Sequence, residues 1–539
     1  MKEIEVQGHS GCQIEIVREG DELYVYKSSR DEKYLSRLVQ QAEKQRRAAA
    51  QEYQHVRVPH IFDVERDSEH VSVKMEYVYS RNFVEFFESA GFEQIEYFVK
   101  ALEAFVEREL AESPIQTVST SAVMSKFEDV CFKIVSNPHL AGNADIERLV
   151  ERCRMRFDDF ARQGTIEIPV GTCHGDLTFS NILFNGNNYY LIDFLDSFIE
   201  TPLMDIVKIR QDTAHLWSQL MYTKRYDRLR LNIICEKIDQ AIDHYFSRYE
   251  WYRDNYGIFQ LLNLLRVLQY AHEERVTEYL KREIGVLLDG KGASVKAVPE
   301  VTRRGEGFSL IVPAAADNAA TPDVMPYVFG LDSSGVMLCV RALQGLNLDV
   351  FDNIYITILR KHAERFCVSD LLAMQLRRFG MDNARIVVLD EPTRSQTETI
   401  YRTIRKEGIE GGIFIKDADG YFAGEVRREN AIAIYPMESM PLLDPQHKSY
   451  VAVDDMYYVT NMIEKRIIGH HFNAGGSCFE NVEDYCAYYE SLSQKSDKVY
   501  VSHIIYQMLL DKKKFRPIEV NRFLDWGSPE LLGFYVDHS

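Results

Sequence analysis

The sequence lacks the features of a membrane-spanning or secreted protein. No run of about 18 apolar residues occurs in it, which argues against a transmembrane helix, and its first residues, MKEIEVQGHSG, contain no apolar signal core. The nine cysteines are scattered, with no C-x-x-C pair, which argues against a disulfide framework or a cysteine zinc site. We therefore expect a cytoplasmic protein with reduced thiols and no membrane insertion.

Basic residues are also in deficit. Asp and Glu number 82 against 63 Lys and Arg, which gives a net charge of −19. A surface of this sign repels nucleic acids and anionic membranes, so we expect no nucleic-acid partner, although a local basic pocket for phosphates is compatible with it. The length of 539 residues exceeds what one hydrophobic core accommodates, which predicts two or three domains.

The segment 171–196, GTCHGDLTFSNILFNGNNYYLIDFLD, contains the chemistry around which the chain is organised. Asp176 is followed five residues later by Asn181, and Asp193 follows a short apolar run beyond an Asn/Gly turn, which predicts a β-hairpin with acidic residues near its ends. Phosphoryl transfer from ATP requires one carboxylate to orient the acceptor hydroxyl, and an amide and a second carboxylate to hold Mg²⁺. The spacing predicts Asp176 as the base and Asn181 and Asp193 as the Mg²⁺ ligands. The alternative is that these side chains only close turns.

The motifs H-G-D-x-x-x-x-N and I-D-F in this segment resemble those of the aminoglycoside phosphotransferase and choline kinase family, over residues 1–290. The resemblance implies an α+β, protein-kinase-like bilobal domain. It implies that this domain phosphorylates a small hydroxylated molecule with ATP and Mg²⁺. The family also has an Asp that opens a later helix, and Asp205 matches it.

A lysine and a glutamate near the N-terminus complete the expected nucleotide site. Lys27 ends the second strand of a predicted hairpin, and Glu43 lies in the middle of a helical segment, 34–53. The resemblance implies that Lys27 contacts the ATP phosphates and that Glu43 orients it. Glu32 and Glu52 are alternatives to Glu43 as the glutamate that pairs with Lys27. The alternative for Lys27 itself is that it is an ordinary lysine on the protein surface.

The helices expected after Asp193 are rich in aromatic residues. Two interpretations stay open: the rings form a cage for a quaternary ammonium group through cation–π contacts, or they form the helical core. The residues concerned are Trp217, Tyr222, Tyr245, Trp251 and Tyr252.

A Gly- and charge-rich segment, 291–306, predicts a linker, and a second domain follows at 307–539. Beyond the linker, apolar strands alternate with helical segments, which predicts an α/β domain with a mostly parallel, doubly wound sheet. Ligands of such sheets bind beyond the carboxyl ends of the strands. The predicted strands are 308–312, 354–359, 384–389 and 412–415.

The motifs of the second domain resemble those of the sugar nucleotidyltransferase (nucleotide-sugar pyrophosphorylase) family. They are Asp417 at a strand end, the pair Glu464-Lys465, the segment 472–476 and Asp525 in D-W-G-S-P. The resemblance implies that Asp417 and Asp525 share a divalent ion and that Glu464 and Lys465 lie beside them, with Lys465 facing the phosphate of the acceptor. CTP or another NTP would be the nucleotide.

The second domain departs from that family at its first loop. Residues 313–320, PAAADNAA, contain no glycine and no arginine, and Pro326-Tyr327 stands where the family has Pro-Lys. Without cations or free backbone amides, little neutralises the charge of a triphosphate in the transition state. Either Arg360, Lys361 or Arg394 substitutes, or the domain binds a nucleotide-linked product without making it.

The leading hypothesis is a bifunctional enzyme, a small-molecule kinase fused to a nucleotidyltransferase-like domain that activates or binds the phosphorylated product. By analogy with proteins of similar fold, such an enzyme would act in the biosynthesis of surface polysaccharides or phospholipid headgroups. The second hypothesis keeps the kinase and makes the C-terminal half a non-catalytic binding or regulatory module. A third makes residues 417–419, D-A-D, the metal motif of a glycosyltransferase, and the Glu464-Lys465 and D-W-G-S-P motifs count against it.

Overall fold

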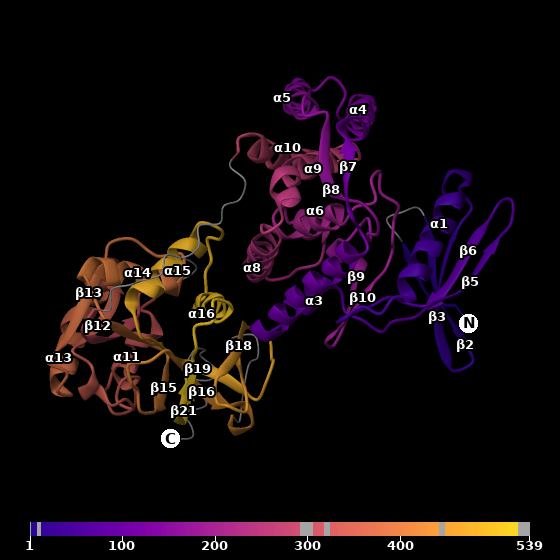
Figure 1. Ribbon diagram of the computed structural model, residues 1–539. Helices are drawn as coiled ribbons and strands as arrows, with labels where there is room; N and C mark the ends of the chain where they lie inside the picture. The colour runs from indigo at the N-terminus through magenta and orange to yellow at the C-terminus, as the bar shows by residue number, and fades with distance from the viewer. Residues whose placement is uncertain (1, 8–11, 291–304, 317–323, 441–447, 527–539) are drawn as a thin grey trace. The chain divides into compact units, whose positions relative to one another are not determined.

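The computed structural model describes residues 2–7, 12–290, 305–316, 324–440 and 448–526 (Figure 1). Most of the expected linker, 291–304, lies outside the described residues. The chain divides into two compact units: Met1–Glu88 with Gln94–Val295, and Ser89–Glu93 with Lys296–Ser539. Each unit contains both helices and strands, which confirms the expected mixture of α and β structure in two domains.

The first unit begins with a five-stranded sheet in the order β1-β2-β3-β6-β5, in which every neighbouring pair is antiparallel. Helix α1 (Glu32–Ala49) covers the sheet, where Leu35, Leu38 and Ala42 pack with Val71 and Val73 of β6 (Figure 1). The strands are β1 Lys2–Gln7, β2 Gln13–Glu19, β3 Glu22–Ser29, β5 Ile61–Arg66 and β6 Val71–Glu76.

The rest of this unit is mainly helical. Helix α6 (Pro202–Thr213) is almost wholly buried and contacts α8, α9 and β8. The predicted hairpin is confirmed as β9 (Ile182–Asn185) and β10 (Asn188–Leu191), whose turn joins Asn185 to Asn188. The short strands β4 Val56–Arg57, β7 Ile115–Ser119 and β8 Thr165–Pro169 complete two small sheets. The other helical elements are α2 Phe83–Phe87, α3 Phe92–Ala111, α4 Thr120–Ser136, α5 Ala144–Ala161, η1 Phe179–Asn181, α7 Trp217–Met221, α8 Arg228–Phe246, α9 Glu250–Leu268 and α10 Glu274–Leu288.

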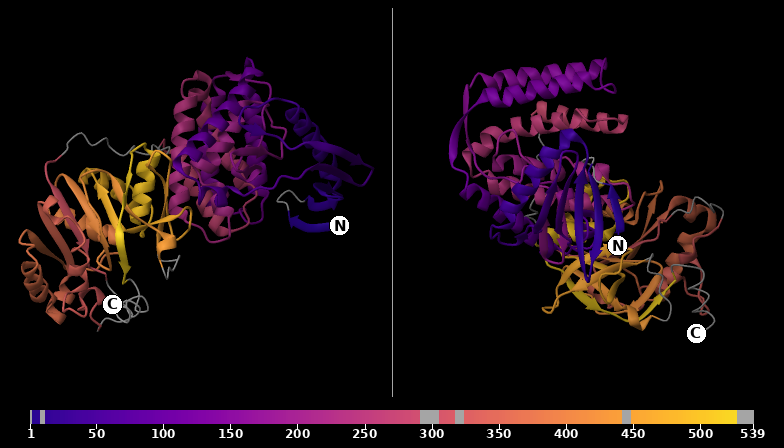
Figure 2. Two further views of the ribbon diagram at one scale, coloured as in Figure 1. Left: turned by 90° about the horizontal axis from the view of Figure 1, so that it is seen from below. Right: turned by 90° about the vertical axis from the view of Figure 1, so that its right-hand side faces the viewer.

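The second unit is built on a nine-stranded sheet, whose strands run from pink-red through orange to yellow in Figure 2. Its four predicted strands are neighbours and run parallel, in the order β13-β12-β11-β14. The sheet as a whole is mixed, because β19 runs antiparallel to β14 and to β16. The strands of the unit are β11 Phe308–Pro313, β12 Asn353–Leu359, β13 Ala384–Leu389, β14 Gly412–Lys416, β16 Ala431–Pro436, β17 Ser449–Val453, β18 Val459–Glu464, β19 His471–Phe479 and β20 Arg516–Glu519, with β15 Gly420–Ala423 paired separately with β21 Asn521–Asp525.

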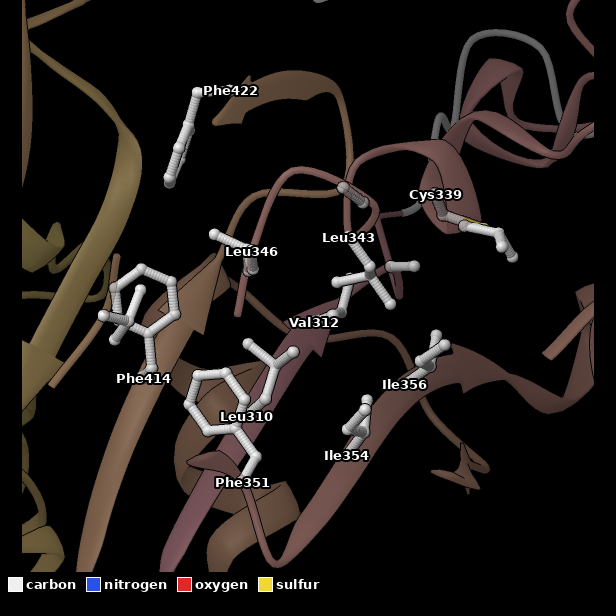
Figure 3. Close-up of a cluster of buried hydrophobic side chains, with 14 of the residues drawn as sticks. Leu310, Val312, Cys339, Leu343, Leu346, Phe351, Ile354, Ile356, Phe414 and Phe422 are labelled. Atoms are coloured by element: carbon white, nitrogen blue, oxygen red, sulfur yellow. The ribbon is translucent and has the colours of Figure 1, made fainter. Parts of the chain in front are cut away.

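Helices pack on this sheet through an apolar core. Leu310 of β11, Ile356 of β12 and Phe414 of β14 belong to one cluster with Cys339 and Leu343 (Figure 3), and all five side chains are fully buried. Burying one such side chain stabilises the fold by about 1.5–3 kcal/mol. The helical elements are η2 Tyr327–Phe329, α11 Leu338–Arg341, η3 Leu348–Val350, α12 Arg360–Phe366, α13 Val368–Arg378, α14 Gln396–Glu407, η4 Met437–Ser439, α15 Val482–Ser493 and α16 Val501–Leu510.

None of the helices in the described part of the chain is long and apolar enough to cross a membrane.

Candidate active site

Helix α6 holds both ends of the loop that contains Asp176. The backbone N–H groups of His174 and Gly175 donate to the two carboxylate oxygens of Asp205, at 2.6 and 2.7 Å. The backbone N–H of Phe179 donates to Asp212, at 2.6 Å. Asp205 and Asp212 are seven residues apart and thus lie on one face of the helix. Burial raises the pKa of Asp205 to about 8 and that of Asp212 to about 6, while the N–H donors oppose the rise.

His174 connects this loop to the strand that precedes Asp193. Its Nε2–H donates to the carbonyl of Ile192 at 2.9 Å, and its Nδ1 accepts from the backbone N–H of Asp176 at 3.2 Å. Burial lowers the pKa of His174 to about 4, so the ring is neutral at pH 7. A neutral ring is what this pair of bonds requires, since one nitrogen must accept.

Asp176 lies between a lysine and an amide. Lys208 of α6 is 3.0 Å from Oδ1, and the side-chain amide of Asn181 donates to Oδ2 at 3.1 Å. Burial alone would raise the pKa of Asp176, but Lys208 and Asn181 outweigh burial and hold the pKa below its usual value. The group is therefore a carboxylate at neutral pH, which is the state a general base requires.

The oxygen atoms of Asn181 and Asp193 fit a magnesium ion. Asn181 uses its NH₂ group on the backbone carbonyl and carboxylate of Asp176, which leaves its amide oxygen for a metal. The backbone φ of Asp193 is 63°, a left-handed conformation that costs about 1–3 kcal/mol. Among the residues described, no group of three or more His, Cys, Asp and Glu is arranged to hold a metal. Mg²⁺ that arrives with nucleotide phosphates needs only one or two protein carboxylates.

The expected pair of Lys27 and Glu43 is not formed. Lys27 is 4% exposed, and its ammonium contacts Asp193 at 2.7 Å. Glu43 is exposed, as are Glu32 and Glu52. The prediction of this pairing was wrong because the core residues of α1, among them Leu38 and Ala42, set the rotation of the helix and turn Glu43 to solvent. The role of Lys27 toward ATP stays a prediction.

Helix α1 instead contributes a cation to the candidate site. The ammonium of Lys44 is 2.6 Å from the carboxylate of Glu200 and donates to the carbonyl of Leu195 at 2.6 Å. Leu195 in turn donates its N–H to the carbonyl of His174. Lys44 thus ties α1 to the segment that contains Asp193.

Two of the five aromatic candidates belong to the helical core. Trp251 and Tyr252 are 8% and 2% exposed. The hydroxyl of Tyr252 bonds to Asp243 and to Arg210, and Arg210 forms a buried ion pair with Asp239 at 2.8 Å. These two rings therefore have structural contacts of their own.

In the second unit, three carboxylates gather at the carboxyl end of β14. Gly420 pairs with Asp525, and the N–H of Trp526 donates to the carbonyl of Asp419 at 2.8 Å. Burial and the nearby charge of Asp417 raise the pKa of Asp419. The ammonium of Lys448 is 2.5 Å from Asp525, and both side chains are largely buried. A shared metal between Asp417 and Asp525 stays a prediction, and the cation that contacts Asp525 in the structure is Lys448.

Glu464 and Lys465 lie next to Lys448 and Ser449. Glu464 ends β18 and accepts from the hydroxyls of Ser449 and Ser502. The side chain of Lys465 is exposed, and its N–H donates to the carbonyl of Lys448 at 2.8 Å. The Glu464-Lys465 motif is therefore connected through the backbone to the lysine that contacts Asp525.

The expected phosphate loop offers few free groups where it is described. The N–H of Ala314 donates to the carbonyl of Thr357, and residues 317–320 lie outside the described residues. Two of the proposed substitute cations already have partners: Arg360 contacts Asp390 at 2.5 Å, and Arg394 contacts Glu398 at 3.1 Å. Tyr327 donates to Asp419 at 3.1 Å.

Sequence reasoning missed Lys208, Asp212, Lys44 and Lys448. A signal existed for the first two, because Asp205, Lys208 and Asp212 fall on one face of a helix with the spacing i, i+3, i+7. No comparable pattern marks Lys44 or Lys448.

Comparison with known proteins gives the following. Residues 132–231 match the model of the phosphotransferase enzyme family (APH), whereas no curated protein matches the chain. Similar solved structures include a nucleoside-diphosphate-sugar pyrophosphorylase from Vibrio cholerae, at 14% identity and a TM-score of 0.35, covering 42% of this chain and 99% of that one. An inositol-1-phosphate CTP transferase from T. maritima has 14% identity and a TM-score of 0.34, over 43% of this chain and 94% of its own. A putative glucose-1-phosphate thymidylyltransferase from Bacillus anthracis has 11% identity and a TM-score of 0.34, over the same shares.

The segment that matches the APH phosphotransferase model, residues 132–231, includes Asp176, Asn181, Asp193 and Asp205.

Proposed function

We propose that the N-terminal unit is a bilobal, kinase-like phosphotransferase that transfers the γ-phosphoryl group of ATP to a hydroxyl of a small molecule. The observation that supports this most is the carboxylate of Asp176, held between Lys208 and Asn181 and joined through His174 to the strand before Asp193. A base, an amide ligand and a carboxylate ligand are the groups that such a transfer requires.

In the proposed reaction, Asp176 accepts the proton of the acceptor hydroxyl. The hydroxyl oxygen forms a bond to the γ-phosphorus as the bond from that phosphorus to the β,γ-bridging oxygen breaks, and ADP leaves. Asn181 and Asp193 would hold Mg²⁺, which neutralises charge on the phosphates. Lys27, which contacts Asp193 at 2.7 Å, would move its contact to the phosphates once Mg²⁺ binds the carboxylate.

Acceptor-dependent ADP release tests this function. The full chain with Mg²⁺ and ATP should release ADP in the presence of a hydroxylated acceptor, in a screen of polyols, sugars, amino alcohols and hydroxy acids. Release that is absent with every acceptor class, or that persists unchanged in Asp176→Asn, would refute the proposal.

For the C-terminal unit we propose a doubly wound, nucleotidyltransferase-like domain that binds or activates the phosphorylated product, with CTP or another NTP as the nucleotide. The carboxylates of Asp417, Asp419 and Asp525 at one end of the sheet support it. A kinase joined to such a domain would make the phosphate that the second unit uses, which supports a role in surface-polysaccharide or headgroup biosynthesis. Pyrophosphate release from an NTP and the kinase product would establish the transferase.

A specific observation favours the non-catalytic alternative for this unit. Arg360 and Arg394 are engaged by carboxylates, and the cation at Asp525 is a lysine ammonium. Each of these cations would have to leave its carboxylate partner before it could stabilise the charge of a triphosphate. If no NTP yields pyrophosphate while the kinase is active, the unit binds its nucleotide or sugar ligand without turnover.

A further inference from the structure

A stripe of polar side chains crosses the otherwise apolar buried part of helix α9. Gln260, Asn263 and Arg266 follow one another at a spacing of three residues, which places them on one side of the helix. Gln260 and Asn263 are fully buried, at 0% exposure. Such residues are rare in a helical core unless their polar groups have partners.

This stripe is connected to the proposed base. The amide of Asn263 donates to the side-chain oxygen of Gln211 on α6, at 2.8 Å. The same oxygen accepts from Lys208 at 3.4 Å, and Lys208 contacts Asp176 at 3.0 Å. The stripe therefore belongs to the surroundings of the hydroxyl that Asp176 would deprotonate.

Several polar atoms of the stripe have no partner among the described residues. They are the side-chain oxygen of Asn263, the oxygen and nitrogen of Gln260, and Nη1 of Arg266, and all are inaccessible to solvent. An unsatisfied buried polar group destabilises the fold, and an unsatisfied charge does so more strongly. In a helical core such atoms take hydrogen bonds from ordered water or from a polar ligand, and the link through Lys208 to Asp176 favours a ligand of the proposed acceptor site.

The charged side chains near the stripe determine which charge the ligand should have. Burial lowers the pKa of Arg266, and the carboxylate of Asp176 is the leading charge that opposes this effect. Lys208 already neutralises Asp176, and Arg37 adds a further positive charge. The guanidinium of Arg266 also lies 6.0 Å from the ring centre of Phe198, so this ring faces a cation of the chain itself. A quaternary ammonium would be repelled here, whereas an anion would be attracted.

We infer that the acceptor has an anionic group, a carboxylate or a phosphate, in addition to the hydroxyl that it presents to Asp176. Arg266 binds the anion, and Asn263 and Gln260 bind further hydroxyl groups. This inference rests on the proposed kinase function and specifies its substrate class.

Acceptors that share one skeleton and differ in charge test the inference. Glycerol, 3-amino-1,2-propanediol, glycerate and glycerol 3-phosphate form one set, and glucose, glucosamine, glucuronate and glucose 6-phosphate form a second. The full chain should release ADP at least about tenfold faster, in kcat/KM, with the anionic members of a set, and the difference between carboxylate and phosphate members identifies the group. Faster release with a neutral or aminated member would overturn the inference while leaving the kinase function intact.

Substitution of Arg266 separates the acceptor from the nucleotide. Arg266→Gln should raise the acceptor KM by about 100-fold or more and leave the KM of ATP within about threefold, because a charged hydrogen bond to the acceptor alone is lost. Arg266→Lys should recover part of the loss. Arg253→Gln, at an exposed position of the same helix, is the matched control and should change neither constant. An equal rise in the KM of ATP would show that Arg266 binds the nucleotide, against the inference.

A binding measurement needs no turnover and keeps the inference testable if the kinase function fails. Calorimetric titration of the full chain with glycerate, glycerol 3-phosphate and inorganic phosphate should detect binding of at least one. That binding should be lost in Arg266→Gln, with an unchanged unfolding temperature as the check on folding. Binding that is equal in the variant, or absent with all three anions in the wild type, would overturn the inference.

Discussion

The two carboxylate sites of this chain differ in how their charges are balanced. In the N-terminal unit, Asp176 keeps its charge between Lys208 and Asn181, and Lys27 and Asp193 are partners that a metal and a phosphate can separate. In the C-terminal unit, the ammonium of Lys448 is held in a largely buried pair with Asp525. The first site thus resembles a catalytic centre before its ligands arrive, and the second a site that the chain itself has neutralised.

The two sites also differ in the residues that hold their carboxylates and loops in place. Three side chains of α6, Asp205, Lys208 and Asp212, bond to the backbone of the N-terminal loop and to Asp176, its proposed base. In the C-terminal unit, the buried Lys416 donates to the carbonyls of Asp417 and Gly420. The comparison teaches that anchored carboxylates alone do not identify an active site. Cations that can exchange their carboxylate partner for the substrate, as proposed for Lys27, are also required.

The largest expected effect is on stability, at Lys448. Lys448→Met removes the ammonium that contacts the largely buried carboxylate of Asp525, and breaking a buried ion pair in this way should cost about 3–5 kcal/mol. Scanning calorimetry should show a lower unfolding temperature for one transition of the chain. Added Mg²⁺ should raise it again in the variant and not in the wild type, because the metal replaces the ammonium. If the unfolding temperature of Lys448→Met equalled that of the wild type, the ammonium of Lys448 would not stabilise the C-terminal site, and the proposed difference between the two sites would be refuted.

His174 predicts a pH dependence of stability for the N-terminal unit. Its pKa is about 4 in the folded chain against a usual 6.5, so the unfolded chain binds more protons between these values. Stability should therefore fall by about 3 kcal/mol as the pH falls from 6.5 to 4.

The matching variant for this prediction is His174→Gln, measured by urea unfolding at several pH values. Asp205 and Asp212, whose pKa values are raised, act in the opposite direction, so the quantity to compare is the difference between wild type and variant. His60→Gln, at an exposed position, is the control. A difference that does not change between pH 6.5 and 4 would contradict the neutral, buried ring.

Asp193 should matter for nucleotide binding. Asp193→Ala removes a proposed Mg²⁺ ligand and the partner of Lys27, and we expect Mg²⁺-ATP to bind about 100-fold more weakly, since losing even an outer partner of a metal site costs 10–100-fold. Equilibrium binding of a fluorescent ATP analogue measures this. Asp196→Ala, at an exposed position three residues away, should bind normally. Normal binding in Asp193→Ala would leave the metal role without support.

The smallest effect is expected at Glu43. Glu43→Gln should leave both the rate and the KM of ATP unchanged, and stability within about 0.5 kcal/mol, because the side chain is exposed. Lys27→Met should instead raise the KM of ATP. A loss in Glu43→Gln comparable to that in Lys27→Met would show that the two residues pair during catalysis, contrary to their positions in the structure.

Local spacing was enough to predict that Asp176 and Asn181 lie close together. Asn181 bonds to Asp176 five residues earlier, and the hairpin of β9 and β10 returns the chain to Asp193, so the sequence itself encodes their proximity. Lys208 comes from a helix that begins about twenty residues after Asn181, and Lys44 contacts Glu200 across 156 positions. Such long-range contacts depend on packing, which no motif in this sequence records.

The fold was predictable to a similar extent. The four parallel strands of the second unit follow from apolar runs between helical segments. The antiparallel β19 was not predicted, because pairing direction depends on which strand is its neighbour in space. Glu43 was misplaced for a related reason: the core residues of α1, which only the packing identifies, decide which face of the helix is buried.

The most direct test of the central claim is the acceptor-dependent ADP release of Asp176→Asn at saturating ATP. The amide cannot accept the proton of the acceptor hydroxyl, so the rate should fall about 10²–10⁴-fold, the usual contribution of a general base. Binding of Mg²⁺-ATP should remain within about threefold of the wild type, since the proposed metal ligands are retained. A variant that binds ATP and still turns over at close to the wild-type rate would contradict the assignment of Asp176 as the base.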